Sequence, residues 1–538
     1  MSRSEPTLYI YSERMKYRYI PLALLSALTV ATASEAQTIR SAPRLVVSIT
    51  IDQLRTDYLE AFAPLYSANG FKRLLNQGLV YTNVSYPFSP IDRASAVAAV
   101  VTGTTPYYNT ITGGQWLDRE TLRPVVCTDD KKYPGLSTNE TSSPRNLSTS
   151  SVGDELKATT NGKAIVYAIA PFRDAAVLSA GHAADGALWI DDNNGYWCSS
   201  QYYYKSLPSW LSAYNEIKSV AKKIQEKVWT PQTELSGNFS YFMNGGMQKP
   251  FSHKFSGARR FRQYKASALV NTDITDMAMQ CLGSCGMGLD ATTDLLNLTY
   301  YAGNFDHQTV GECQMELQDT YVKLDGEIER LINLVEKKIG GDNVLFVITG
   351  TGYSDEENTD YAKYRIPTGT FYMNRIANLL NMYMGGLWGQ ERYVETCFGA
   401  QIYLNHKIFE QKKVSFAEAC DRAQEFLSLL SGVRNVYTSL QLLSSATPET
   451  RKIRNGFNLE RNGDILIEVA PGWRLLNEDN LDNQLVRASF VQFPLIIYGA
   501  GTKAERIAEP ITTDRIAPTL AKAIRIRAPN ACSSEPLF

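Results

Sequence analysis

Two stretches of the chain end in residues that could do chemistry. The run RLVVSITID at residues 44–52 is a near-continuous β-branched sequence that ends in the carboxylate of Asp52. A second apolar run, residues 344–348, is followed by small and acidic residues: Thr351, Gly352, Asp355 and Glu356. Because α/β enzymes place their sites at the carboxyl ends of parallel strands, the two strand ends predict one candidate site. Only four histidines are available to it, which limits any site with several zinc ions.

The elements that would position these residues alternate between strand and helix along the chain. The expected strands and helices are 44–52, 70–84 (helix then strand), 89–103 (helix), 163–170 (strand), 319–349 (long amphipathic helix then strand) and 490–501 (strand). Such alternation predicts an α/β fold with a mostly parallel central sheet covered on both faces. In the helix at 89–103 we expect Ser89 to be the N-cap and Pro90 to lie in the first turn.

Two regions break the alternation and are expected to be cap insertions at one edge of the sheet, at about 183–265 and 359–465. The first contains the aromatic cluster Tyr202–Tyr203–Tyr204, which could form a binding surface but more often packs inside a cap. The remaining chain, from about 40 to 538, is expected to form one domain around the sheet. A formal net charge of −1 gives no indication of a nucleic-acid partner.

The N-terminal residues have the pattern of an export signal. A basic start at 15–18 precedes the apolar run YIPLALLSALTVATA, and small residues follow at 34–37. We expect residues 1–36 to be a signal peptide cleaved near Ala36, with 1–14 an upstream extension; the start is either Met15 or Met1. An uncleaved anchor or a buried helix is the alternative. The protein is then expected in the periplasm, free or associated with the envelope, with no transmembrane span after cleavage.

Eight cysteines are present, and two of them form a C-x3-C pair, Cys281 and Cys285. No second pair completes a zinc ribbon. An oxidising compartment would permit a local disulfide, and two free thiols are the other interpretation.

Several ordered motifs resemble the alkaline phosphatase superfamily. They are ITIDQLRTDYL at 49–59, GFKRLLNQG at 70–78, TGTTPYYNTITGGQW at 102–116, VLSAGHAADGALW at 177–189 and IAPTLAKAIRIRAPNACSSEPL at 516–537. The closest branch is that of exported phosphate-irrepressible alkaline phosphatases, related to type I phosphodiesterases and nucleotide pyrophosphatases. The resemblance implies a three-layer sandwich. It also implies two zinc ions at the strand ends, with a Thr or Ser nucleophile between them at a helix N-terminus.

Checked position by position, the chain departs from that pattern. Of seven positions that the resemblance assigns to the nucleophile and metal ligands, Asp52 alone keeps its chemistry, and the others hold Arg93 (nucleophile), Asn304, Gln308, Thr351, Gly352 and Gln492. Arginine stays protonated and cannot attack phosphorus, and Asn and Gln are poor zinc ligands. Ser95 could be a displaced nucleophile. The places of the family's monoester-selecting Lys and Arg hold Phe172 and Asp174, with Arg173 between them.

Three functions follow from this reading. The first is a catalytically inactive, exported protein that binds a protein partner or acts as a scaffold and needs no cofactor. The second is a zinc-dependent phosphomonoesterase or phosphodiesterase whose ligands are regrouped from Asp52, Asp92, Asp306, His307, Asp355 and Glu356. The third is a metal-free module that binds phosphate or another anion through Arg93 at a helix N-terminus. Alternatively, Arg93 pairs with Asp52 or Asp92 and replaces the missing cation.

The other histidines are expected to have no catalytic role. His182 lies in a motif of the resemblance but not among its zinc ligands, and is expected to be structural. His253 and His406 have no ligand partners at suitable spacing in the sequence.

Overall fold

A computed structural model describes residues 42–232, 250–355, 361, 363–444, 447–479, 482–485 and 491–538. The chain divides into two units, Met1–Thr38 with Phe538, and Ile39–Leu537. The expected signal segment, 1–36, lies outside the described residues, so its prediction stays open. All of the fold below belongs to the second unit.

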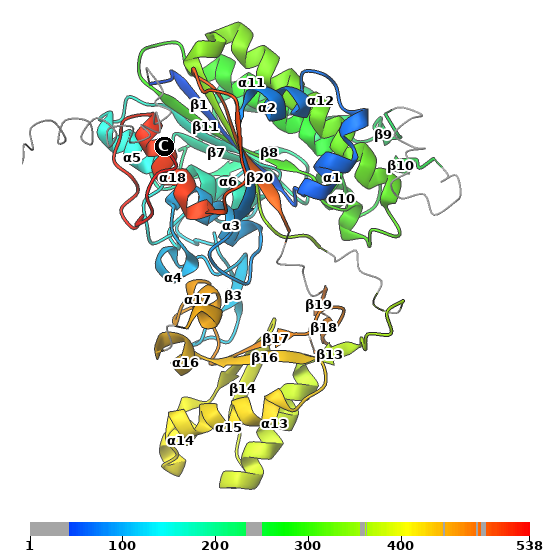
Figure 1. Ribbon diagram of the computed structural model, residues 1–538, viewed down its shortest axis with the longest axis vertical. Coiled ribbons are helices and arrows are strands. Elements are labelled where there is room, and N and C mark those ends of the chain that lie inside the picture. Colours follow the sequence, from blue (N-terminus) through cyan, green and yellow to red (C-terminus); the bar gives the residue numbers. More distant parts are fainter. Residues whose placement is uncertain are drawn as a thin grey trace, which may run out of the picture. The chain divides into compact units, whose positions relative to one another are not determined.

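The centre of the fold is a mixed, mostly parallel sheet (Figure 1). In the described chain it has eleven strands in the order β21-β2-β20-β12-β1-β11-β6-β7-β8-β5, with β22 beside β2. Their bounds are β1 Leu45–Asp52, β2 Leu79–Ser85, β5 Gly135–Leu136, β6 Val166–Ile169, β7 Gly186–Ile190, β8 Trp197–Ser200, β11 Asp294–Tyr301, β12 Val344–Gly350, β20 Phe493–Gly499, β21 Glu505–Ile507 and β22 Ile511–Thr512. The predicted α/β fold is confirmed.

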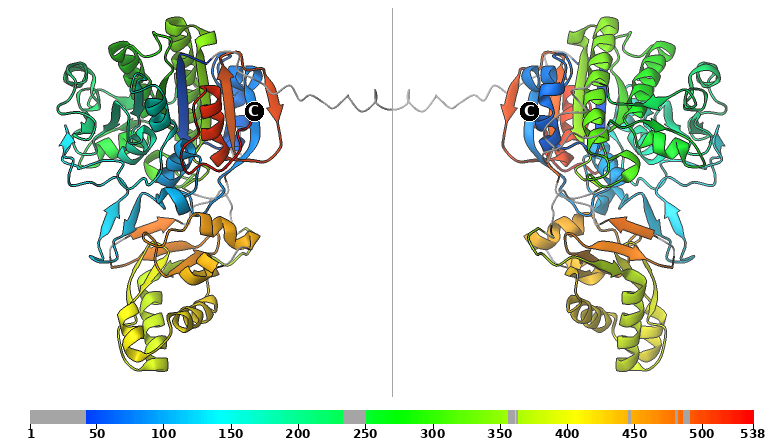
Figure 2. Two further views of the ribbon diagram at one scale, coloured as in Figure 1. Left: turned by 90° about the vertical axis from the view of Figure 1, so that its left-hand side faces the viewer. Right: turned by 90° about the vertical axis from the view of Figure 1, so that its right-hand side faces the viewer.

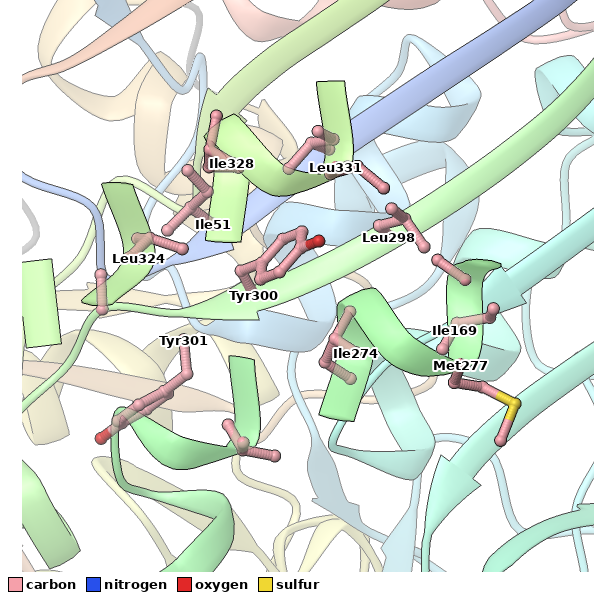
Figure 3. Packing of buried hydrophobic residues seen from close by; sticks show 14 of the residues in the cluster. Ile51, Ile169, Ile274, Met277, Leu298, Tyr300, Tyr301, Leu324, Ile328 and Leu331 are labelled. Carbon is pink, nitrogen blue, oxygen red and sulfur yellow. The ribbon is translucent and has the colours of Figure 1, made fainter. Parts of the chain in front are cut away.

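The two faces of the sheet belong to two different hydrophobic clusters. In β1, the side chains of Leu45, Val47, Ile49 and Ile51 all pack into the cluster beneath α11 and α12. Because side chains alternate along a strand, Asp52 points to the opposite face. The core under α11 and α12 is dense with aliphatic and tyrosine side chains, among them Ile51, Leu298 and Tyr300 (Figure 3). Burial on both faces is what makes the β1 sequence continuously apolar.

Two groups of helices cover these faces (Figure 2). The first group comprises α1 Thr56–Ala61, α2 Phe71–Gln77, α10 Arg260–Lys265, α11 Leu269–Cys285 and α12 Gln314–Ile339. The second comprises α3 Arg93–Thr102, α5 Val152–Thr159, α6 Arg173–Ala180 and α18 Ile516–Ala523. The alanine-rich face of α3 packs with α6 over β6 and β7, so these helices approach the sheet closely. Across the described residues, none of the helices is both long and apolar enough to cross a bilayer.

The expected N-cap of α3 was wrong. The helix begins at Arg93 and its N-cap is Asp92, whose carboxylate accepts a hydrogen bond from the Ser95 backbone N–H at 2.9 Å. The Ser95 hydroxyl accepts in return from the Asp92 N–H at 3.0 Å, which completes a capping box. Aspartate is as good a cap as serine, and here it sits one residue before the helix, whereas Ser89 lies too early.

The expected insertion at 183–265 also begins too early. β7 and β8 lie inside it, yet β7 extends the central sheet parallel to β6 and β8 pairs antiparallel with β7. The polar turn at 192–195 makes this part of the sequence resemble a loop, although the residues of both strands are buried. The elements that follow are α7 Ser209–Lys218, α8 Val220–Lys223, β9 Val228–Trp229 and β10 His253–Lys254. Tyr202, in the turn after β8, donates to the His182 carbonyl at 2.8 Å, so it serves packing.

The chain between β12 and β20 forms sheets and a core of its own. One sheet has the order β14-β15-β17-β16 and the other β13-β18-β19. The elements are β13 Thr370–Tyr372, α13 Met373–Trp388, β14 Val394–Phe398, β15 Gln401–Leu404, α14 His406–Lys412, α15 Phe416–Ser428, β16 Val433–Thr438, α16 Ser439–Ser444, α17 Pro448–Asn455, β17 Ile465–Val469, β18 Arg474–Asn477 and β19 Asp482–Leu485. Its hydrophobic cluster draws on residues from Phe371 to Leu475 and is separate from both sheet clusters.

Near the candidate site, α4 Pro106–Asn109 and the hairpin of β3 Gln115–Leu117 with β4 Pro124–Val126 follow α3. Arg119 in this hairpin pairs with Asp464 of the β12–β20 segment at 3.0 Å. Asp464 also accepts from His406 at 3.0 Å and from the Leu404 N–H at 2.8 Å. One buried carboxylate therefore ties this segment to the hairpin.

Candidate functional site

Asp52 ends β1 on the sheet face that α3 and α6 cover, and its side chain is fully buried. One carboxylate oxygen accepts hydrogen bonds from Tyr353 at 2.8 Å and from Thr351 at 3.1 Å. Burial raises the pKa of the Asp52 carboxyl above its usual range, while Arg93 opposes that rise. An ionised carboxylate at this depth needs a cation beside it.

That cation is Arg93, the first residue of α3. One of its terminal nitrogens lies 3.4 Å from the second oxygen of Asp52. Its Nε and other terminal nitrogen face Asp174 of α6 at 3.1 and 3.0 Å, and the guanidinium lies over the Phe172 ring at 3.8 Å. Burial works against the charge, but the two carboxylates outweigh it and raise the pKa of Arg93. Arg93 is therefore fixed by two carboxylates and one aromatic ring.

Of the two partners expected for Arg93, Asp52 or Asp92, the structure shows Asp52, and Asp92 has other contacts. The Asp92 carboxylate caps α3 and also accepts from the Gly114 N–H at 2.6 Å, so it joins the helix start to the β3 hairpin. Ser95 is fully buried, and its hydroxyl bonds Asp92 at 2.8 Å. The geometry thus directs Ser95 into the cap, away from Asp52.

Thr351 and Gly352 follow β12. Thr351 is fully buried, and its hydroxyl accepts from the Gln53 N–H at 2.8 Å besides donating to Asp52. Gly352 has φ +70°, and a Cβ placed on it would lie 2.7 Å from Tyr86 and 2.8 Å from Phe493. A side chain at position 352 would need both rings to move.

Asn304 and Gln308 flank a short 3-10 turn, η3 Phe305–His307. The Asn304 amide donates to the Gln308 carbonyl at 2.9 Å, so Asn304 closes its own loop. Asp306 pairs with Arg259 at 3.0 Å and accepts from Gln263 at 3.1 Å. Asp306 is therefore neutralised by a neighbouring loop.

His307 and Asp355 are the two members of the regrouped set that the structure brings into direct contact. His307 Nδ1 lies 2.7 Å from an Asp355 oxygen, which also accepts from Gln53 at 2.7 Å. Gln53 in turn accepts from the Asp355 N–H at 3.1 Å. Half of the His307 side chain is exposed, whereas Asp355 is buried. Glu356 lies outside the described residues.

The two remaining positions of the expected site, Gln492 and Arg173, have their contacts outside the Asp52 cluster. Gln492 is exposed and its side chain donates to the Thr82 carbonyl at 3.3 Å. Arg173 pairs with Asp129 at 2.9 Å, so it does not share the Arg93 cluster. Two contact residues of the site, Gln53 and Tyr353, were missed by sequence reasoning, because no motif marks them. Phe172 and Asp174 were placed as the monoester-selecting positions of the resemblance, and their contact with Arg93 was not predicted.

The remaining histidines have partners that the sequence did not reveal. His182 Nδ1 lies 3.1 Å from Asp154 and Nε2 lies 2.9 Å from the Leu147 carbonyl. Both partners are acceptors, so the ring is best satisfied as an imidazolium, and the Asp154 bond raises the pKa of His182. His253 pairs with Glu316 at 2.6 Å. These contacts are structural.

The donor set beside Asp52 does not fit zinc. A zinc site needs about three His, Cys or carboxylate ligands, and the described residues contain no such group of three. The neighbours of Asp52 are an arginine, a threonine and a tyrosine hydroxyl. A zinc ion on Asp52 would also lie against the Arg93 charge, at a repulsive distance.

Comparison with known proteins defines the class. A family model for type I phosphodiesterase / nucleotide pyrophosphatase matches residues 46–491, and the chain belongs to this family. Alkaline phosphatase PafA of Elizabethkingia meningoseptica is 28% identical over 535 residues, which cover 96% of this chain and 98% of that protein. Alkaline phosphatase PhoV of Synechococcus elongatus is 28% identical over 507 residues, 91% of each chain.

The fold agrees with these sequence matches. The crystal structure of wild-type alkaline phosphatase PafA superposes with a TM-score of 0.80 at 26% identity, over 92% of this chain and 98% of that one. The expected resemblance to the alkaline phosphatase superfamily is therefore confirmed.

Proposed function

We propose that this chain is a catalytically inactive member of its family that acts by binding, with a protein as partner. The observation that carries the proposal is the position of Arg93 between Asp52 and Asp174. At the helix start where the resemblance expects a nucleophile, the guanidinium supplies the positive charge that Asp52 needs. The site is then stable without metal, and Arg93, at the helix start, cannot attack phosphorus because it stays protonated.

The packing around Gly352 supports the same proposal independently of charge. Tyr86 and Phe493 occupy the space that a side chain at this position would need. The packing therefore also disfavours a metal ligand at position 352, because both rings would have to shift to make room for it.

The anion-binding alternative is weaker. Its premise is a guanidinium available to phosphate, but the nitrogens of Arg93 already face Asp174 and Asp52. Two carboxylates beside one guanidinium leave the cluster with a negative formal charge, which repels an anion. The α3 N-terminus is also satisfied by its own cap, Asp92. We expect inorganic phosphate to leave the melting temperature unchanged.

An active phosphoesterase remains the second candidate, because two relatives bear the name alkaline phosphatase. The contact of His307 with Asp355 is the observation that favours it. A carboxylate fixes Nδ1 of a ring that is half exposed, which is how enzymes orient a general base or a ligand. Export, to the periplasm or its envelope, is proposed for either candidate from the N-terminal pattern.

Metal content and turnover decide between the candidates. The purified protein is dialysed against zinc, its metal is measured by mass spectrometry, and hydrolysis of p-nitrophenyl phosphate and its diester is followed. We expect less than one zinc per chain and equal, background rates for the wild type and Asp52→Ala. Stoichiometric zinc with turnover that is lost in Asp52→Ala would overturn the proposal. Turnover lost only in His307→Ala would identify a rearranged site.

A further inference from the structure

The C-terminal turn of α11 holds two thiols on one helix face, outside the candidate site. Cys281 and Cys285 are four residues apart, so they are neighbours on the helix surface. Their sulfur atoms lie 4.0 Å apart and both are free thiols. The structure therefore describes the reduced form of the C-x3-C pair.

The two thiols differ in access to solvent. Cys281 is fully buried in the cluster beneath α11 and α12, whereas Cys285 is only partly buried. A small molecule can approach the sulfur of Cys285 directly. It can reach Cys281 only after it has been attached to Cys285.

The two thiols also differ in acidity. A hydrogen bond from Cys281 lowers the pKa of Cys285, burial opposes this, and the Tyr167 hydroxyl adds a second donor, so the pKa is about 7. Burial raises the pKa of Cys281 well above the usual range. The helix C-terminus itself disfavours a thiolate, so the two hydrogen bonds carry the effect. Near neutral pH, Cys285 is the nucleophile and Cys281 its protonated neighbour.

We propose that Cys285 and Cys281 form a thiol–disulfide exchange site for low-molecular-weight disulfides. The Cys285 thiolate attacks one sulfur of the small disulfide, and the first small thiolate leaves and takes a proton from water. Cys281 then loses its proton to solvent and attacks the Cys285 sulfur, which expels the second small thiolate. In total the protein dithiol gives up two electrons and two protons, and the small disulfide becomes two thiols.

The oxidised product requires the end of the helix to adjust. In a regular helix the Cβ atoms of residues four apart lie about 5–6 Å from each other, whereas a disulfide brings them to about 3.5–4.5 Å. Cys285 is the last residue of α11 and Gly286 follows it, so formation of the disulfide would distort the last turn only. The Cys281–Cys285 disulfide would cross-link the last turn of α11, a helix that packs on α12 and β11.

Cys397 provides a matched control. It is also a partly buried free thiol, but burial raises its pKa to about 11. At pH 7 the thiolate fraction of Cys285 is about 5,000-fold larger than that of Cys397. The more basic Cys397 thiolate is intrinsically more reactive, and a Brønsted slope of about 0.45 makes that advantage about 60-fold. Cys285 should therefore be alkylated roughly 100-fold faster than Cys397.

The first experiment uses the wild type alone, so it does not depend on any variant folding. Full-length protein is treated with iodoacetamide between pH 5 and 9, and each cysteine is followed by peptide mass spectrometry. We expect Cys285 to react first, with a half-maximal rate near pH 7. Equal rates at Cys285 and Cys397 would overturn the assignment of the nucleophile.

The second experiment uses oxidised glutathione as the disulfide. The wild type should lose two hydrogens and form a Cys281–Cys285 disulfide, and Cys397→Ala should do the same. Cys281→Ala should stop at a glutathione adduct on Cys285, and Cys285→Ala should show neither product. Near-ultraviolet circular dichroism checks the fold of each variant. A wild type that keeps both thiols, or an adduct elsewhere that forms faster, would contradict the proposal.

Discussion

Replacing Arg93 by methionine keeps a long side chain over Phe172 but removes the charge that Asp52 and Asp174 share. The Asp52 and Arg93 side chains are 1% and 21% exposed, so water can replace little of the lost interaction. Removing one partner of a buried ion pair costs about 3–5 kcal/mol. Loss of the cation over the Phe172 ring, 3.8 Å away, adds about 1 kcal/mol. We expect Arg93→Met to lower the free energy of unfolding by about 4–6 kcal/mol at pH 8.

The destabilisation should depend on pH in a defined direction. Burial already raises the pKa of Asp52 in the folded state, and Arg93 restrains it, so the variant raises that pKa further. The folded variant then binds a proton that the unfolded chain releases above a pKa of about 3.9. Its stability is retained below that pH and falls as pH rises towards the folded pKa, by at most about 1.4 kcal/mol per pH unit. The effect of Arg93→Met should therefore be much smaller at pH 4.5 than at pH 8.

Arg375→Met is the matched control. Arg375 also pairs with a carboxylate, Glu478 at 2.6 Å, and lies over an aromatic ring, Tyr372 at 4.2 Å, but its side chain is 60% exposed. Exposed pairs of this kind contribute little to stability, because water and salt screen the two charges. Urea unfolding followed by tryptophan fluorescence compares the two. Equal losses at pH 8, or an Arg93→Met loss that does not change with pH, would refute the reasoning from buried charge.

Three further predictions concern the hydrogen-bonded carboxylates Asp92, Asp464 and Asp154. Asp92→Ala should cost about 2 kcal/mol in urea unfolding, because it removes the α3 cap and the bond to the β3 hairpin, while a surface alanine substitution serves as reference. Asp464→Asn should lower the free energy of unfolding by about 2–3 kcal/mol, because it leaves Arg119 without its buried carboxylate. Limited proteolysis should then cut the β12–β20 segment faster, and an unchanged rate of cutting would contradict this prediction. His182→Ala should destabilise most between about pH 4 and 6.5, because the raised pKa of His182 gives stability that is lost as pH rises through it. Burial opposes the ionised form of Asp154, but hydrogen bonds from His182 and the backbone outweigh it and lower the pKa of Asp154, which gives stability that is lost at low pH. A destabilisation by His182→Ala that does not change with pH would contradict this prediction.

The sequence predicted those parts of the fold that depend on local pattern. The β-branched run ending at Asp52 could only be a strand buried on both faces, and the period of residues 319–339 required a long amphipathic helix. The β7–β8 pair was missed because its polar turn outweighs two short buried strands. Ser89 was preferred as a cap because it precedes proline, although Asp92 satisfies the helix start better.

The site could be predicted in part, and the limit is physical. The strand end supplied Asp52, and the helix start supplied Arg93. Asp174 lies 81 residues from Arg93 and Thr351 lies 299 from Asp52, so their contacts arise from the sheet order and not from any motif. The pairing of Gln53 with Asp355, 302 residues apart, has the same origin. Residue types gave the candidate positions, and the tertiary structure decides which of them contact Asp52.

The glycine after β12 also limits what a substitution could add to the site. A Cβ placed on Gly352 would lie 2.7 Å from Tyr86 and 2.8 Å from Phe493, and the Tyr86 hydroxyl donates to the Gly350 carbonyl at 2.9 Å. A Gly352→His substitution would have to displace two buried rings before its imidazole could approach Asp52. Under the proposed function, one substitution at this position could not create a zinc ligand, because the rings around it would have to change as well.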